Sequence, residues 1–257
     1  MLRPFVVQGR VITALLLRET RATFGTSHMG YAWAVITPAI GVALLVYIFS
    51  LVGRQAPYGH SLALFFATGM LTVEFFNRLS TTLMTGIEAN KTLLMYPLVG
   101  EVDVLLSRAL LISITYVLIM AIFYGGLWAT GLAGPPRDPA TLVSAFLATA
   151  ALGTGLGTFN AALVGVWDSW RHVEKVLTRP MVFVSGVFYV PELLPRELGL
   201  VLWWNPVLHL VEWFRVAYYP TYPQGIFTPW YPLAWAAGLF LAGLALERAT
   251  RSQRSLI

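Results

Sequence analysis

An uncharged run from residue 31 to residue 53, YAWAVITPAIGVALLVYIFSLVG, constrains the fold of this chain most strongly. A helix needs about 20 mostly apolar residues to cross the hydrocarbon core of a bilayer, and this run is long enough. Charged residues make up only 11% of the chain, less than half of the roughly 25% that is usual in soluble domains. We therefore expect an all-α polytopic membrane protein.

Further apolar stretches predict six transmembrane helices in a single transmembrane domain, 1–257. The approximate ranges of these helices are 31–53, 61–85, 109–129, 140–166, 176–190 and 230–247. Pro38 is expected to kink the first helix. The turn GPPRDP at 134–139 cannot continue a helix, so it separates the third from the fourth. The fifth range requires the side chain of Arg179 to extend to the membrane interface.

The segment 191–229 is apolar and aromatic, yet several prolines and charged residues interrupt it. It is too irregular for one straight span. Irregular backbone is tolerated at membrane depth only where it contacts protein or water. We expect two short re-entrant helices here, dipping into the outer leaflet between spans five and six.

The first 27 residues predict a helix of a different kind. At 100° per residue, Arg3, Arg10, Arg18 and Arg21 fall within an arc of about 80°. Apolar residues such as Ile12 lie on the opposite side. This pattern is typical of an N-terminal amphipathic helix lying in the membrane interface; the alternative is a basic tail that only sets the orientation.

Basic residues are distributed unevenly over the two sides of the predicted membrane segments. One side carries Arg3, Arg10, Arg18, Arg21, Lys91, Arg171, Lys175, Arg179, Arg248, Arg251 and Arg254, whereas the other carries Arg54, Arg137, Arg196 and Arg215. Lys and Arg accumulate in cytoplasmic loops. The distribution therefore predicts that both termini are cytoplasmic.

Several function classes find no support in the sequence. The net charge of +5 is not gathered into a dense basic run, which argues against a nucleic-acid partner. The chain has no cysteine, and its histidines are not spaced as metal ligands. The stretch from Gly86 to Thr92 resembles a phosphate-binding loop, but Asn90 stands where that motif requires glycine before the lysine. We expect no metal, no bound cofactor and no catalytic residues in this chain.

Glu74 and Arg78 stand out as charges inside the second predicted span. An intramembrane charge costs about 2.5–3.5 kcal/mol on insertion scales, so each needs compensation. Their spacing of four residues suits an intramembrane ion pair. The alternative is a polar wall beside a transport path. Arg108, near the end of the third span, is expected to extend to the interface.

The loop after the second span, GIEANKTLLMYPLVGEVD, contains a short amphipathic stretch at 87–96. Glu88, Asn90 and Lys91 are expected to face water. The apolar residues that follow would face the groove of a partner protein, as in helix-in-groove recognition. These apolar residues are Leu93, Leu94, Met95 and Tyr96. The alternative is an ordinary loop.

Three stretches together resemble the ABC-2 permeases, most closely those of bacterial capsular-polysaccharide export. The first is LRETRATFGTSHMGYAWAVITP at 17–38, in which paired arginines precede Gly-Tyr-x-Trp and a proline. The second is NKTLLMYPLV at 90–99, which is similar to the coupling helix of the family. The third is 185–215, containing SGVFY, LP and WNPVLHLVEWFR. One departure is His28, which stands where the family pattern has arginine.

The resemblance implies a homodimer that works with two ABC ATPase subunits on a separate chain, which would use ATP and Mg. The coupling helix 87–96 would dock into a groove of each ATPase. A glycolipid substrate would enter from the cytoplasmic side of the bacterial inner membrane. A periplasmic adaptor of the polysaccharide co-polymerase type and an outer-membrane polysaccharide exporter would take the polymer onward.

The placement of particular residues fits this implied mechanism at three points. The canal between two copies, formed mainly by spans one and five, would have the aromatic lining Tyr31, Trp33, Tyr47, Phe183, Phe188 and Tyr189. The entrance for the phosphate of the lipid anchor would contain Arg18, Arg21 and His28. The periplasmic gate within 191–229 would contain Trp203, Trp204, Asn205, His209, Glu212 and Arg215.

Other readings remain open. An O-antigen or teichoic-acid permease shares most of these features, and so does an ABC-2 exporter of drugs or small lipids. An integral membrane transferase would need an acid–base set, whereas Glu74 is the one deep carboxylate and no histidine stands near it in sequence. Stimulation of the partner ATPase by glycolipid, compared with small hydrophobic compounds, would separate these classes.

Overall fold

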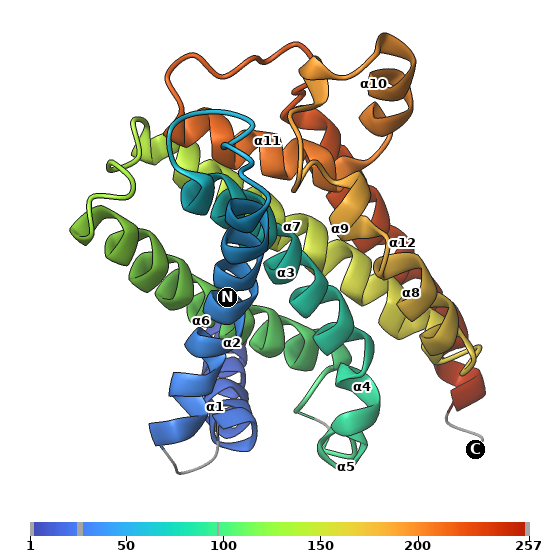
Figure 1. The fold of residues 1–257 in the computed structure, drawn as a ribbon. Coiled ribbons are helices and arrows are strands. Elements are labelled where there is room, and N and C mark those ends of the chain that lie inside the picture. Colours follow the sequence, from blue (N-terminus) through green and yellow to red (C-terminus); the bar gives the residue numbers. More distant parts are fainter. Residues whose placement is uncertain (1–2, 25–27, 97, 255–257) are drawn as a thin grey trace.

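The computed structural model describes residues 3–24, 28–96 and 98–254 of the chain, and this part is built from helices joined by loops. Figure 1 shows long helices that run between two ends of a bundle, with short helices gathered at both ends. The expectation of an all-α architecture is confirmed.

Four of the predicted spans form helices that are long and apolar enough to cross a membrane. These are α3 (Leu62–Met84), α6 (Glu101–Ala129), α7 (Pro139–Val164) and α12 (Trp230–Arg254). At 1.5 Å per residue, each is at least about 35 Å long. Helix α6 begins about two turns before the predicted start at 109, because Asp103 accepts a bond from the Gly100 N–H at 3.0 Å and caps the helix there.

The first predicted span corresponds to α2 (His28–Leu51), in which the stretch from Val35 to Leu51 is apolar. Pro38 lies inside this helix but does not end it. N-terminal to α2, the chain forms α1 (Arg3–Phe24), which agrees with the expected N-terminal helix.

The range 176–190 does not form the single helix predicted for a fifth span. It is divided among α8 (Trp170–Thr178), α9 (Met181–Val184) and a turn. Pro180 separates the two helices because it has no N–H to donate, and Gly186 then takes φ +76°, a conformation that favours glycine. The count of six crossings therefore stays a prediction.

Helix α7 lies at the centre of the bundle, between α3 and α12. A Cβ placed on Gly153 or Gly157 would come within 2.8 Å or 2.7 Å of Leu79 or Leu83 in α3. On the side facing α12, a Cβ on Gly243 would lie 2.8 Å from the Phe159 nitrogen. Small residues thus let these backbones approach closely, as the glycine spacing in this span indicates.

Helix α7 begins at a defined cap. Asp138 accepts hydrogen bonds from the backbone N–H groups of Ala140 and Thr141, and Pro139 occupies the first helical position. A hydrogen bond from the Thr141 hydroxyl, together with these backbone bonds, lowers the pKa of the Asp138 carboxyl. The turn predicted at 134–139 therefore ends at the N-terminal cap of α7.

The segment 191–229 forms η1 (Pro191–Leu193), α10 (Arg196–Trp203) and α11 (Pro206–Tyr218), followed by a loop. Two short helices were expected here, and their depth in the membrane stays a prediction. Helix α11 packs against α7 and α3. In Figure 1, α10 and α11 lie at the upper end of the bundle, while α4 (Gly86–Ala89), α5 (Lys91–Leu94) and the C-terminal end lie at the lower end.

Candidate functional site

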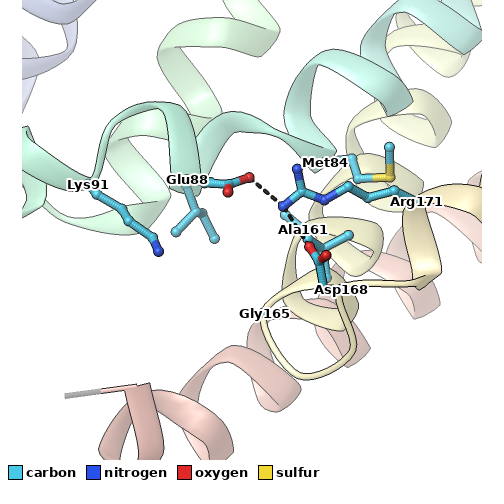
Figure 2. A pocket seen from close by; sticks show the side chains of 9 residues that line it. Met84, Glu88, Lys91, Ala161, Gly165, Asp168 and Arg171 are labelled. Atoms are coloured by element: carbon cyan, nitrogen blue, oxygen red, sulfur yellow. Dashed lines mark hydrogen bonds and ion pairs between the residues drawn. The ribbon is translucent and has the colours of Figure 1, made fainter. Parts of the chain in front are cut away.

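A pocket of about 310 Å³ joins the loop after α3 to the start of α8 (Figure 2). Arg171 is its central side chain. It forms an ion pair with Glu88 of α4 and a second one, at 3.1 Å, with Asp168 before α8. Lys91 of α5 lines the same pocket. The arrangement connects the loop that carries α4 and α5 directly to α8.

The predicted coupling stretch 87–96 is not one helix. It consists of two single turns, α4 and α5, separated at Asn90. Asn90 was expected to face water, but only 2% of it is exposed. Its side chain turns inward, where it donates to the Gly86 carbonyl at 3.0 Å and also meets residues of α1.

The far end of this stretch is open. Met95 is 82% exposed and Tyr96 is 62% exposed, whereas Leu93 and Leu94 are half-buried. Glu88 and Lys91 are exposed as expected. Large apolar side chains exposed at the end of a bundle suit contact with another protein.

Asn90 belongs to a polar cluster, largely buried except for Arg18, that ties α1 to α6. Arg18 donates to the Asn90 side-chain oxygen at 2.6 Å, and Asn90 donates to Glu19 at 3.0 Å. Arg108 pairs with Glu19 at 3.3 Å and also donates to the Thr82 carbonyl at 3.1 Å. The prediction that Arg108 extends to the interface is therefore wrong, because these two partners hold its side chain inside the bundle. The cluster fixes α1 against the coupling stretch.

The structure describes the side chains of two of the three residues predicted for the phosphate entrance. Arg18 is bound to Asn90, and Arg21 is exposed at the end of α1. The side chain of His28 lies outside the described part of the chain.

The aromatic residues predicted for the canal fall into two groups. Trp33 and Tyr47 are exposed on one face of α2, and Phe183 is exposed on α9. Phe188 is half-buried and packs against Phe183, with ring centroids 5.6 Å apart. Tyr189 is also half-buried, and the side chain of Tyr31 lies outside the described residues.

Glu74 and Arg78 do not form the predicted ion pair among the side chains that the structure describes. Both line a pocket of about 290 Å³ between α2, α3 and α6 instead. Trp33 and Tyr116 line the same pocket. This arrangement fits the alternative interpretation of the two charges as a polar wall.

A buried ion pair occurs elsewhere, in α11. Glu212 and Arg215 have no exposed surface and pair at 3.2 Å. The Tyr222 hydroxyl donates to Glu212 at 2.8 Å, and Arg215 donates to the carbonyls of Tyr189 and Val187 at 3.0 Å and 3.3 Å. The pair therefore joins α11 to the turn after α9 and to the loop after α11.

His209 and Asn205 hold the other end of α11. The Nδ1 atom of His209 accepts the Thr228 N–H at 3.2 Å, so the proton is on Nε2, which donates to the Trp203 carbonyl at 2.9 Å. Burial lowers the pKa of His209 and favours this neutral form. Asn205 caps α11 and donates to the Val184 carbonyl at 3.1 Å. Trp204 is exposed.

Comparisons with known proteins agree on one family. The profile of the ABC-2 type transporter family matches residues 10–219. The chain is 29% identical over 253 residues to the polysialic acid transport protein KpsM of Escherichia coli, covering 98% of this chain and 97% of the relative.

Two further relatives carry related names. The capsule polysaccharide export inner-membrane protein CtrC of Neisseria meningitidis is 26% identical over 245 residues, covering 95% of this chain and 92% of the relative. The protein of the same description from Haemophilus influenzae, BexB, is 27% identical over 217 residues, covering 83% and 80%.

Proposed function

Because the chain belongs to the ABC-2 type transporter family, we propose that it is the membrane permease subunit of an ATP-driven exporter of lipid-linked capsular polysaccharide. The observation that carries this proposal is the extent of the similarity to KpsM, which covers 98% of this chain and 97% of that protein. Relatives named as inner-membrane proteins support placement in the bacterial inner membrane.

The lower end of the bundle in Figure 1 is the proposed docking end. A separate ATPase subunit, which binds ATP and Mg, would contact Met95 and Tyr96, because these large apolar side chains are exposed beside α5. Movement of α4 would reach α8 through the Glu88–Arg171 ion pair and α1 through Asn90. Both termini would be cytoplasmic, on the same side as the ATPase.

The exposed face of α2 is the proposed contact between two copies. It presents an apolar stripe in which Trp33, Ile40 and Tyr47 recur at helical spacing. The lipid-linked polymer would pass between the copies, beside this stripe and Phe183. Segment 191–229 would close the far end as a gate and would meet the periplasmic adaptor, which passes the polymer to an outer-membrane exporter.

The docking proposal is tested with the purified permease and its ATPase partner in proteoliposomes. We expect Met95→Asp combined with Tyr96→Asp to weaken ATPase binding about tenfold or more, because a central apolar anchor contributes about 2 kcal/mol or more to an interface. ATP-driven export of lipid-linked capsular polysaccharide should fall with it. Thr130→Asp, at the opposite end of α6, is the matched control and should change neither quantity.

Two results would contradict the proposal. Normal ATPase binding by the double variant would place the docking surface elsewhere. If small hydrophobic compounds stimulate ATP hydrolysis and the lipid-linked polymer does not, the substrate is a drug or a small lipid and not the polymer.

A further inference from the structure

The pocket between α2, α3 and α6 combines side chains that rarely occur together inside a membrane protein. Its wall carries the carboxylate of Glu74, the guanidinium of Arg78 and the phenol of Tyr116, with Thr37 and Thr115 beside them. Trp33 lies at the edge, with 56% of its surface exposed. The volume is about 290 Å³, at the lower end of the range of about 300–1,000 Å³ seen for small-ligand sites.

The two charges are not explained by mutual pairing. Glu74 and Arg78 form no ion pair within the described residues. The Tyr116 hydroxyl donates to Glu74, whereas Arg78 is exposed. Each charge carries an insertion cost of about 2.5–3.5 kcal/mol in a spanning helix. Such residues usually face a cavity that holds water or a substrate. A polar ligand in this pocket would explain why both charges are kept.

The chemistry of the wall favours a neutral ligand with several hydroxyl groups. A carboxylate accepts hydrogen bonds, a guanidinium donates five, and hydroxyl groups do both. One acid and one base leave the wall with no net charge, so a phosphate would meet repulsion from Glu74 as well as attraction to Arg78. The exposed indole of Trp33 offers an apolar plate to the face of a ring.

We propose that this pocket, within a single subunit, binds a sugar ring of a glycolipid. The inference rests on the proposed export function and deepens it by adding a saccharide site within one subunit that borders the canal at Trp33. The pocket lies beside the first turns of α2 and the half of α3 nearer α4. A headgroup could therefore be held there before the polymer enters the canal.

The absence of cysteine from the chain allows a direct test. Thr37→Cys places a single thiol on the pocket wall, and Ser50→Cys places one near the far end of α2 as the matched control. The rate of labelling by N-ethylmaleimide is measured by mass spectrometry in lipid nanodiscs. The probe is octyl β-glucoside, compared with octyl phosphate and octanol, which share its alkyl chain.

We expect octyl β-glucoside at about ten times its Kd to slow labelling of Cys at position 37 about tenfold, and to leave position 50 unchanged. Octyl phosphate and octanol should protect far less. Glu74→Gln and Arg78→Gln should each raise the Kd of the glucoside about tenfold, since a hydrogen bond to a charged group contributes about 1.5–3 kcal/mol. Thermal unfolding in detergent checks that these variants remain folded.

The inference is overturned if the glucoside gives no protection, if octanol or octyl phosphate protects equally, or if neither charge substitution weakens protection. Export by the complex with its ATPase is measured separately. If the complex exports the polymer but the glucoside does not protect position 37, the sugar site is rejected and the proposed permease function stands. If the glucoside protects position 37 but the complex does not export the polymer, the proposed permease function is rejected.

Discussion

At the scale of single residues, substitution is expected to be most costly at Glu212 and Arg215, because both are completely buried and pair at 3.2 Å. Removing Glu212 leaves the charge of Arg215 buried with no counter-charge and only neutral partners such as the Tyr189 and Val187 carbonyls, and breaking a buried pair in this way costs about 3–5 kcal/mol. We expect Glu212→Leu to destabilise the protein by this amount, measured by thermal unfolding in detergent. The substitution should also loosen the loop that Tyr222 anchors to α11.

A double variant separates charge from packing. Glu212→Leu with Arg215→Met removes both charges and should recover part of the lost stability, because an apolar pair of similar volume is often tolerated. Arg137→Met, in the exposed turn before α7, should have little effect. Equal stability of Glu212→Leu and the unaltered protein would show that the pair does not hold this region together.

Individual residues were predictable where one helix decides their environment, and not where two distant segments meet. Glu19 was missed, although it lies only 20° from Ile12 on the apolar side of α1, and a carboxylate there needs a partner. Its partners Asn90 and Arg108 are far away in the sequence, so no periodicity could have identified them. Arg171 likewise meets Glu88 only in the folded chain.

At the scale of helices, the contact between α7 and α12 depends on glycine. A Cβ on Gly243 would lie 2.8 Å from the backbone nitrogen of Phe159, whereas a Cβ on Gly238 would meet nothing within 4 Å. We expect Gly243→Ala to destabilise the protein by about 1–3 kcal/mol, since overpacking forces the helices apart. Gly238→Ala, in the same helix, should be neutral or slightly stabilising.

Thermal unfolding of the two alanine variants in the same detergent checks this difference. Because both substitutions add one methyl group to α12, helix propensity changes equally and cancels from the comparison. Equal stability of the two variants would mean that α7 and α12 are not packed as closely as described.

The helices that the sequence predicted well are those with long uncharged runs, such as α6 and α7, because length and hydropathy alone decide them. The fifth span was wrong as a single helix, since Pro180 and Gly186 interrupt it. The coupling stretch was also wrong as a single helix, because Asn90, which was expected to face water, is buried where the two short helices meet. Both errors arise where tertiary contacts override a local pattern.

The whole molecule has two unlike ends. The lower end in Figure 1 carries α4, α5 and the C-terminal end of α12, and the upper end carries α10 and the loop after α11. The proposed mechanism requires these ends to lie on opposite sides of the membrane, with Met95 and Tyr96 facing the compartment that contains ATP.

Cysteine labelling in intact cells tests this orientation most directly, because the chain has no cysteine of its own. Lys91→Cys and Arg137→Cys each place one thiol at an exposed position, in the loop after α3 and in the turn before α7. With the outer membrane permeabilised, a charged maleimide that cannot cross the inner membrane should label position 137 and leave position 91 unlabelled until the cells are lysed. Labelling of position 91 in intact cells would place the docking surface outside the cytoplasm and contradict the account.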